Sequence, residues 1–109
     1  MSNPRLPTLT HLQFLVLGLL RAGEQPGRVV RETLGKHGIR RTAPAFYQLM
    51  ARLERDGLIE GRYEQVTVGG QAVTERRYNL LSRGRSRWDE ARDFYAAAGA
   101  AGDTRWSDA

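Results

Sequence analysis

The sequence contains no cysteine, and it has no apolar run long enough to cross a membrane. Without cysteine there are no disulfides, thiolate metal sites or cysteine nucleophiles, which fits a reducing compartment and leads us to expect a cytoplasmic protein. The most apolar stretch, residues 12–20, is nine residues long and includes Gln13, whereas a transmembrane helix needs about 20. We therefore interpret this stretch as a buried helix and expect no membrane partner.

Lysine is almost missing too, so arginine carries the positive charge. The chain of 109 residues has a formal net charge of +5, and Lys36 is its only lysine. A planar guanidinium suits bidentate recognition of phosphate and guanine better than an ammonium does. Double-stranded DNA is therefore the leading candidate partner, although many basic proteins bind no anion and composition alone leaves that alternative open.

The N-terminal part of the chain carries the signals of an arm followed by a helix. Two prolines mark residues 1–7 as a flexible N-terminal arm. Thr10 and Gln13 form a capping-box signature, and residues 12–20 then repeat apolar side chains at helical spacing. We expect this helix to be covered by other elements on most of its sides.

Two further helices are predicted before residue 58. A short amphipathic helix spans residues 28–38, and a third begins at Thr42 as N-cap, with Pro44 in its first turn, where a missing N–H costs nothing. Gly57 is expected to end the third helix.

The next segments are predicted as two strands. Residues 58–68 favour an extended conformation, residues 69–75 suggest a long, glycine-containing loop, and residues 76–81 favour a second strand. A loop of seven residues is long for a hairpin and would have a mobile tip.

This order of elements predicts a mainly α fold with a small β-hairpin, a winged helix-turn-helix with three helices and a two-stranded wing. Residues 8–81 would form the DNA-binding domain, residues 82–98 a C-terminal dimerisation helix, and residues 99–109 a flexible tail.

The third helix carries polar side chains on the side opposite its apolar stripe. In a helix-turn-helix this helix lies in the major groove, where Gln48 can bond to adenine and Arg52 to guanine or phosphate. Any surface helix exposes such residues, and that plain alternative stays open. The residues predicted to contact DNA, wing arginines included, are Arg40, Arg41, Thr42, Pro44, Ala45, Tyr47, Gln48, Arg52, Arg62, Arg76 and Arg77.

Aromatic side chains gather on the last helix. We expect Trp88, Ala91, Phe94 and Tyr95 to form a homodimer interface, because a small core cannot cover them all. The same residues could line a pocket for a planar aromatic effector. Alternatively, Trp88 folds back onto the first helix of its own subunit.

Two stretches together resemble the PadR family of winged-helix transcriptional regulators. These are "FYQLMARLERDGLIEG" and, after the hairpin, "RRYNLLSRG". The resemblance implies a regulator that binds a palindromic operator as a homodimer, often a repressor released by a small ligand, of the compact subgroup with one C-terminal helix. It also implies that Tyr47 faces DNA and that Arg76 and Arg77 are basic wing residues.

The sequence favours binding over catalysis. His11 and His37 lie on different predicted elements, and neither belongs to a group of convergent acids, bases or nucleophiles. We expect no enzyme activity, metal or cofactor. Two other binding functions stay open, a winged-helix adaptor for proteins and a nonspecific architectural DNA-binding protein.

Overall fold

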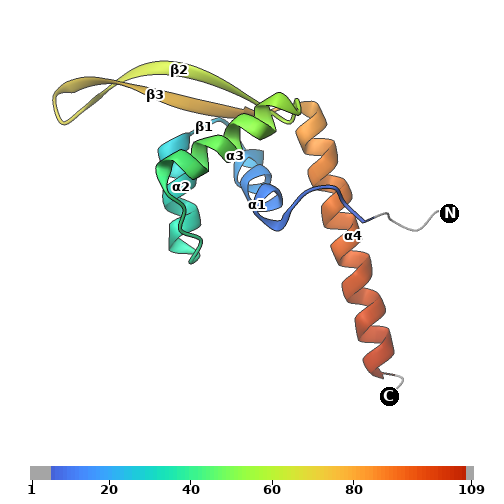
Figure 1. Cartoon of the computed structure of the whole chain (residues 1–109). Coiled ribbons are helices and arrows are strands. Elements are labelled where there is room, and N and C mark those ends of the chain that lie inside the picture. Colours follow the sequence, from blue (N-terminus) through green and yellow to red (C-terminus); the bar gives the residue numbers. More distant parts are fainter. Residues whose placement is uncertain (1–5, 108–109) are drawn as a thin grey trace.

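The computed structural model describes residues 6–107, with side chains for residues 6–100 (Figure 1). Residues 1–5 of the predicted arm and residues 108–109 of the predicted tail lie outside this part. The elements, in chain order, are α1 (His11–Leu19), the 3-10 helix η1 (Leu20–Ala22), β1 (Gln25–Pro26), α2 (Gly27–Lys36), α3 (Ala43–Arg55), β2 (Ile59–Val68), β3 (Gln71–Leu80) and α4 (Ser82–Ser107).

The predicted helix starts are confirmed. The Thr10 hydroxyl accepts from the Gln13 backbone N–H, and the Gln13 side chain accepts from the Thr10 N–H in return. Thr42 accepts from the N–H of Ala45 at the start of α3. These caps satisfy backbone donors that a helix leaves free at its start.

The hydrophobic core lies where α1, α2 and α3 meet the base of the sheet. Tyr78 of β3 is its largest fully buried side chain, and Phe46 of α3 is next. The core is formed by Val16, Leu17, Leu20, Val30, Leu34, Phe46, Met50, Leu53, Leu58, Ile59, Tyr78 and Leu80.

The sheet of the described chain has one more strand than the two-stranded wing that we predicted. Its antiparallel order is β1-β3-β2, and β1 pairs Gln25 with Tyr78 and Pro26 with Arg77. A strand of two residues is too short to show periodicity, and its proline, which cannot donate to a ladder, fits an edge position. The short strand ties the base of the wing to the helices.

The predicted seven-residue loop at the wing tip is wrong. The strands pair as far as Val68 and Gln71, so Gly69 and Gly70 alone make the turn. Both glycines have positive φ, 58° and 82°, as a two-residue type I′ hairpin requires. Residues 71–75, which we placed in the loop, are almost all exposed and show no alternation of polar and apolar side chains, so their sequence does not reveal the start of β3.

Helix α4 is longer than predicted. It continues to Ser107 instead of ending at residue 98, so most of the predicted tail 99–109 is helical. The alanines from position 96 onward favour helix more than Gly99 and Gly102 disfavour it. Figure 1 shows α4 running beside α1 and then continuing beyond the body of the domain, with the wing extending on the other side.

Candidate nucleic-acid interface

The outward surface of α3 is arranged as the sequence predicts. Phe46, Met50 and Leu53 are completely buried, while Gln48 and Arg52 are exposed. Thr42 and Pro44 at the start of the helix are exposed as well, and Ala45 is half-buried. The helix therefore presents a polar surface with small residues near its N-terminus, where a double helix can approach closely.

Tyr47 is held between α3 and α2. Its ring meets Phe46 edge-on, with 5.1 Å between the ring centroids. Gly27, the first residue of α2, leaves it room, since a Cβ there would lie 3.0 Å from the ring and 3.1 Å from the hydroxyl oxygen. The side chain is 37% exposed, so its free edge lies at the surface between the two helices.

Basic side chains from α2 and from the turn before α3 line a shallow groove of about 430 Å³. The Arg31 guanidinium donates to the carbonyl oxygen of Arg41 at 3.0 Å and so joins α2 to that turn. We name this group the basic groove; its cationic residues are Arg28, Arg31, Lys36, Arg40 and Arg41.

Sequence reasoning missed the three cations that α2 contributes to the basic groove. We predicted no DNA contact from α2, but Arg28, Arg31 and Lys36 of this helix line the same groove. The spacing of three between Arg28 and Arg31 was the available signal, because residues three or four apart share a helix face.

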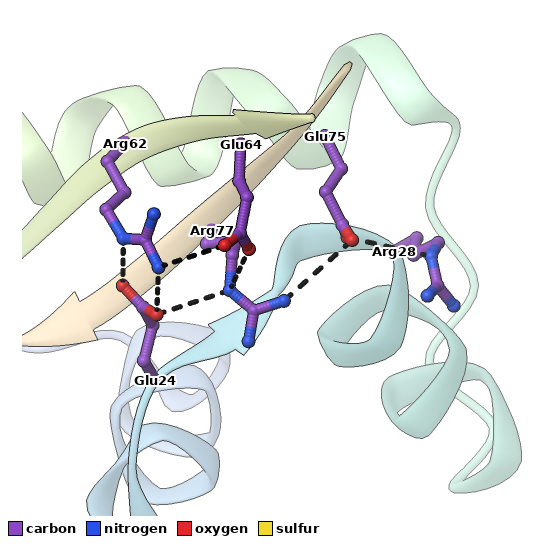
Figure 2. Close-up of polar contacts among 6 residues, drawn as sticks. All are labelled: Glu24, Arg28, Arg62, Glu64, Glu75 and Arg77. Carbon is purple, nitrogen blue, oxygen red and sulfur yellow. Dashed lines mark hydrogen bonds and ion pairs between the residues drawn. The ribbon is translucent and has the colours of Figure 1, made fainter. Parts of the chain in front are cut away.

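The base of the wing holds a cluster of ion pairs (Figure 2). The Glu24 carboxylate accepts two hydrogen bonds from Arg62, at 2.7 Å from Nε and 2.8 Å from Nη2, and a third from Nε of Arg77 at 3.2 Å. Arg77 Nε also lies 3.2 Å from a Glu64 oxygen. The hydrogen bond from Arg62 is the main reason that the pKa of Glu24 falls from 4.5 to about 2.

This cluster is electrically balanced. Arg28 of α2 reaches Glu75 at 3.8 Å, which extends the ion pairs from the wing to the basic groove. We name the six residues the wing-base cluster; they are Glu24, Arg28, Arg62, Glu64, Glu75 and Arg77. Three guanidinium groups meet three carboxylates, so the formal charges cancel.

The third wing arginine is also engaged within the chain. Nη2 of Arg76 donates to both carboxylate oxygens of Glu54 on α3, at 2.8 and 3.0 Å. Its guanidinium lies 4.5 Å from the ring centroid of Tyr63. Gly61 makes room for this pair, because a Cβ there would collide with the Glu54 carboxylate. All three wing arginines predicted to grip phosphate are therefore already paired with carboxylates.

Beyond the wing-base cluster the wing carries no charge. Residues 65–74 include no acidic or basic side chain, and Val68 and Val73 are 53% and 40% exposed. The outer wing is thus a neutral, partly apolar hairpin.

Trp88 and Tyr95 of α4 pack against α1. The Trp88 ring stacks on Phe14, with centroids 5.3 Å apart and planes 2° from parallel, and the Arg21 guanidinium lies 4.0 Å from its centroid. Ala91 is completely buried. The alternative in which Trp88 folds back onto the first helix is what the structure shows, while Phe94 and Tyr95 stay partly exposed.

The described residues contain no group of three or more His, Asp or Glu side chains placed to hold a metal. No helix in the described part of the chain is long and apolar enough to span a membrane.

Helices α1 to α3, the long hairpin and the closing helix together define the winged-helix class of proteins. No protein-family model matches the sequence, and no curated protein matches it. Solved structures do match. A PadR family transcription regulator from hypervirulent Clostridium difficile R20291 has a TM-score of 0.74 at 14% identity, over 89% of this chain and 99% of that one.

Two more matches point the same way. A PadR family transcriptional regulator from Eggerthella lenta DSM 2243 is 28% identical, with a TM-score of 0.61 over 85% of this chain and 80% of that one. Bacillus subtilis PadR, solved in complex with operator DNA, has a TM-score of 0.61 at 23% identity. The match covers 74% of this chain and 47% of that one. The chain has a PadR-like winged-helix fold.

Proposed function

We propose that this protein is a DNA-binding transcriptional regulator whose α3 enters the major groove. One observation carries the proposal. Gln48 and Arg52 on the exposed face of α3 line a hollow together with Arg41, and Arg41 also lines the basic groove, so a surface that can read bases would adjoin one that can bind phosphates. The shared fold with a PadR solved on operator DNA supports it.

Different residues serve the two parts of this contact. Gln48 bonds bidentately to adenine, and Arg52 takes guanine or phosphate. Thr42, Pro44, Ala45 and Tyr47 bring the start of α3 against the bases and sugars. The cations of the basic groove that lie outside the wing-base cluster, Arg31, Lys36, Arg40 and Arg41, bind backbone phosphates, which set affinity and orientation without reading sequence.

We further propose that the protein acts as a homodimer on a palindromic operator. The C-terminal part of α4 extends past the body of the domain (Figure 1), and such a helix gains most of its stability by packing its side chains against a partner. A two-fold axis through α4 would place two α3 helices about 34 to 36 Å apart, one turn of DNA. We also propose that the protein represses transcription, and that it leaves its operator when a planar aromatic ligand binds near Phe94 and Tyr95.

The test is binding of the purified protein to DNA upstream of its own gene, competed with random duplex at two salt concentrations. A sequence-specific complex with dimer stoichiometry supports the regulator. Salt-sensitive binding without preference would favour an architectural protein. No binding at low salt would favour the protein adaptor.

A further inference from the structure

We propose that Glu24 is an internal counter-anion that keeps the wing arginines from external phosphate and thereby makes DNA binding depend on α3. The proposal rests on the proposed function, and it concerns a residue outside the surface that would touch DNA. The Glu24 carboxylate accepts hydrogen bonds from Arg62 and Arg77, as the oxygens of a phosphate group would (Figure 2).

The strand register explains why the wing needs this carboxylate. Arg62 lies directly opposite Arg77, and Glu64 lies directly opposite Glu75. Like charges opposite one another destabilise a sheet. Glu64 lies 3.7 Å from Arg62 but 3.2 Å from Arg77, so it compensates mainly one of the two arginines. Glu24 supplies the close, bidentate contact that Arg62 otherwise lacks.

Glu24 is also well placed to hold the wing against the body. It precedes β1, whose Gln25 pairs with Tyr78 in the sheet. The Gln25 side chain donates to the carbonyl oxygen of Leu19 at 2.6 Å, which fastens the same segment to α1. The carboxylate that binds the wing therefore comes from a short segment tied to the helices on one side and to the sheet on the other.

For DNA binding, the consequence is that the wing is nearly neutral and the available positive charge lies on the helices. With the wing-base cluster balanced and residues 65–74 uncharged, the wing meets the double helix as a nearly neutral hairpin. Cations that bind any phosphate raise affinity for every sequence. By withholding Arg62 and Arg77 from phosphate, Glu24 would lower nonspecific binding and leave discrimination to α3.

The experiment compares Glu24→Gln with Glu60→Gln. Both variants lose one negative charge, but Glu60 is an exposed residue of the same hairpin, opposite Asn79 and outside the wing-base cluster. Affinity for a random-sequence duplex is measured over a series of NaCl concentrations. Each phosphate neutralised adds about 0.9 to the slope of log affinity against log salt. We expect Glu24→Gln to steepen the slope by about 1, mostly through Arg62, and Glu60→Gln to change it little.

A triple variant, Glu24→Gln with Arg62→Gln and Arg77→Gln, identifies the cations responsible. If the released arginines cause the change, the triple variant loses the steeper slope. If the slope stays steep, or if both single variants change it equally, Glu24 is not a specific counter-anion and the proposal is overturned.

A DNA-independent readout separates this proposal from the proposed function. The salt concentration that elutes each variant from a heparin column tests access to sulfate groups. If no variant binds any duplex at low salt but Glu24→Gln elutes later than Glu60→Gln, the regulator proposal fails and the counter-anion stands. If the wild type binds duplex but Glu24→Gln matches Glu60→Gln in both assays, the counter-anion fails alone. Unchanged circular dichroism confirms that each variant is folded.

Discussion

Two glycines of α4 show how one substitution has opposite effects in different surroundings. A Cβ on Gly84 would collide with the backbone carbonyl of Leu58 and lie 2.8 Å from Leu80 Cδ1, whereas Gly99 has open space around it. We expect Gly84→Ala to lower the free energy of unfolding by about 1 to 3 kcal/mol through overpacking. Gly99→Ala should raise it by up to about 1 kcal/mol, because alanine favours helix. Urea unfolding measures both, and two shifts of the same sign would contradict the described packing around Gly84.

Tyr78 should make the fold sensitive to alkaline pH. The side chain is 2% exposed, and burial raises its pKa from 10.0 to about 12. Burial disfavours the phenolate, so the stabilisation is complete below pH 10, the unfolded value, and is lost as pH rises towards 12. With about 1.4 kcal/mol for each pKa unit, the total loss is about 2 to 3 kcal/mol.

The measurement for Tyr78 is the free energy of unfolding at several pH values between 9 and 12. Tyr78→Phe is the matched variant, since it keeps the ring and removes the ionisable hydroxyl. Its stability should fall less steeply over this range than that of the wild type. Parallel curves for the two proteins would show that other groups cause the alkaline loss.

At the scale of elements, α1 and α3 were predictable because their signals are local. Each begins with a threonine that caps within three residues, and the apolar stripe of α3 is the face that is buried. The wing was less predictable. A strand of two residues is too short to show a period, and residues 71–75 show no alternation of polar and apolar side chains, so β1 was missed and the turn was predicted too long.

The candidate site also has one part that the sequence predicts and one part that it does not. The exposed face of α3 follows from helical spacing, which the sequence displays. The partners of the wing arginines do not, since Glu24 lies 38 residues from Arg62 and 53 from Arg77. Only the pairing of β1 with β3 brings them together, and that pairing had no sequence signal. The sequence therefore predicts phosphate contacts for these arginines, whereas the structure pairs both with carboxylates.

On α3 and its preceding turn, base readout and phosphate binding should separate by mutation. We expect Gln48→Ala to cost about 1 to 3 kcal/mol on the operator and little on random duplex, because a lost bidentate contact to adenine affects only one sequence. Arg41→Ala should weaken binding to both and make the salt slope shallower by about 0.9.

Fluorescence anisotropy on operator and random duplex over a salt series gives both results for α3. The control is Arg77→Ala, which removes a cation already paired with carboxylates and should leave the salt slope nearly unchanged. Equal losses on both duplexes for Gln48→Ala would remove that residue from base readout.

The whole molecule is elongated, with principal extents of 62, 27 and 22 Å. The wing and the end of α4 project from opposite sides of the helical body (Figure 1). The wing-base cluster is neutral. The cations of the basic groove lie on α2 and the turn before α3, and the outer wing carries none. For the proposed DNA-binding function, charge therefore favours an approach of DNA along α2 and α3.

The projecting end of α4 leads to the last prediction, which concerns assembly. Phe94 is half-buried, and its ring meets Tyr95 edge-on at 5.4 Å between centroids, so part of an aromatic surface remains for a second subunit. We expect Phe94→Ala to weaken homodimerisation by about 10- to 100-fold, the range for truncating an aromatic anchor. Tyr63→Ala is the control, because it removes a 69% exposed aromatic of the wing, away from α4.

Sedimentation equilibrium over a range of concentrations measures the dimer dissociation constant of each variant, and operator binding is measured alongside it. In the proposed dimer Phe94→Ala should shift both together, because two α3 helices that read a palindrome need a two-fold axis, which α4 would supply. Tyr63→Ala should leave the dimer intact. A wild type that stays monomeric at all concentrations and still binds its operator would remove the two-fold arrangement, and α4 would then act by packing on α1 of its own subunit.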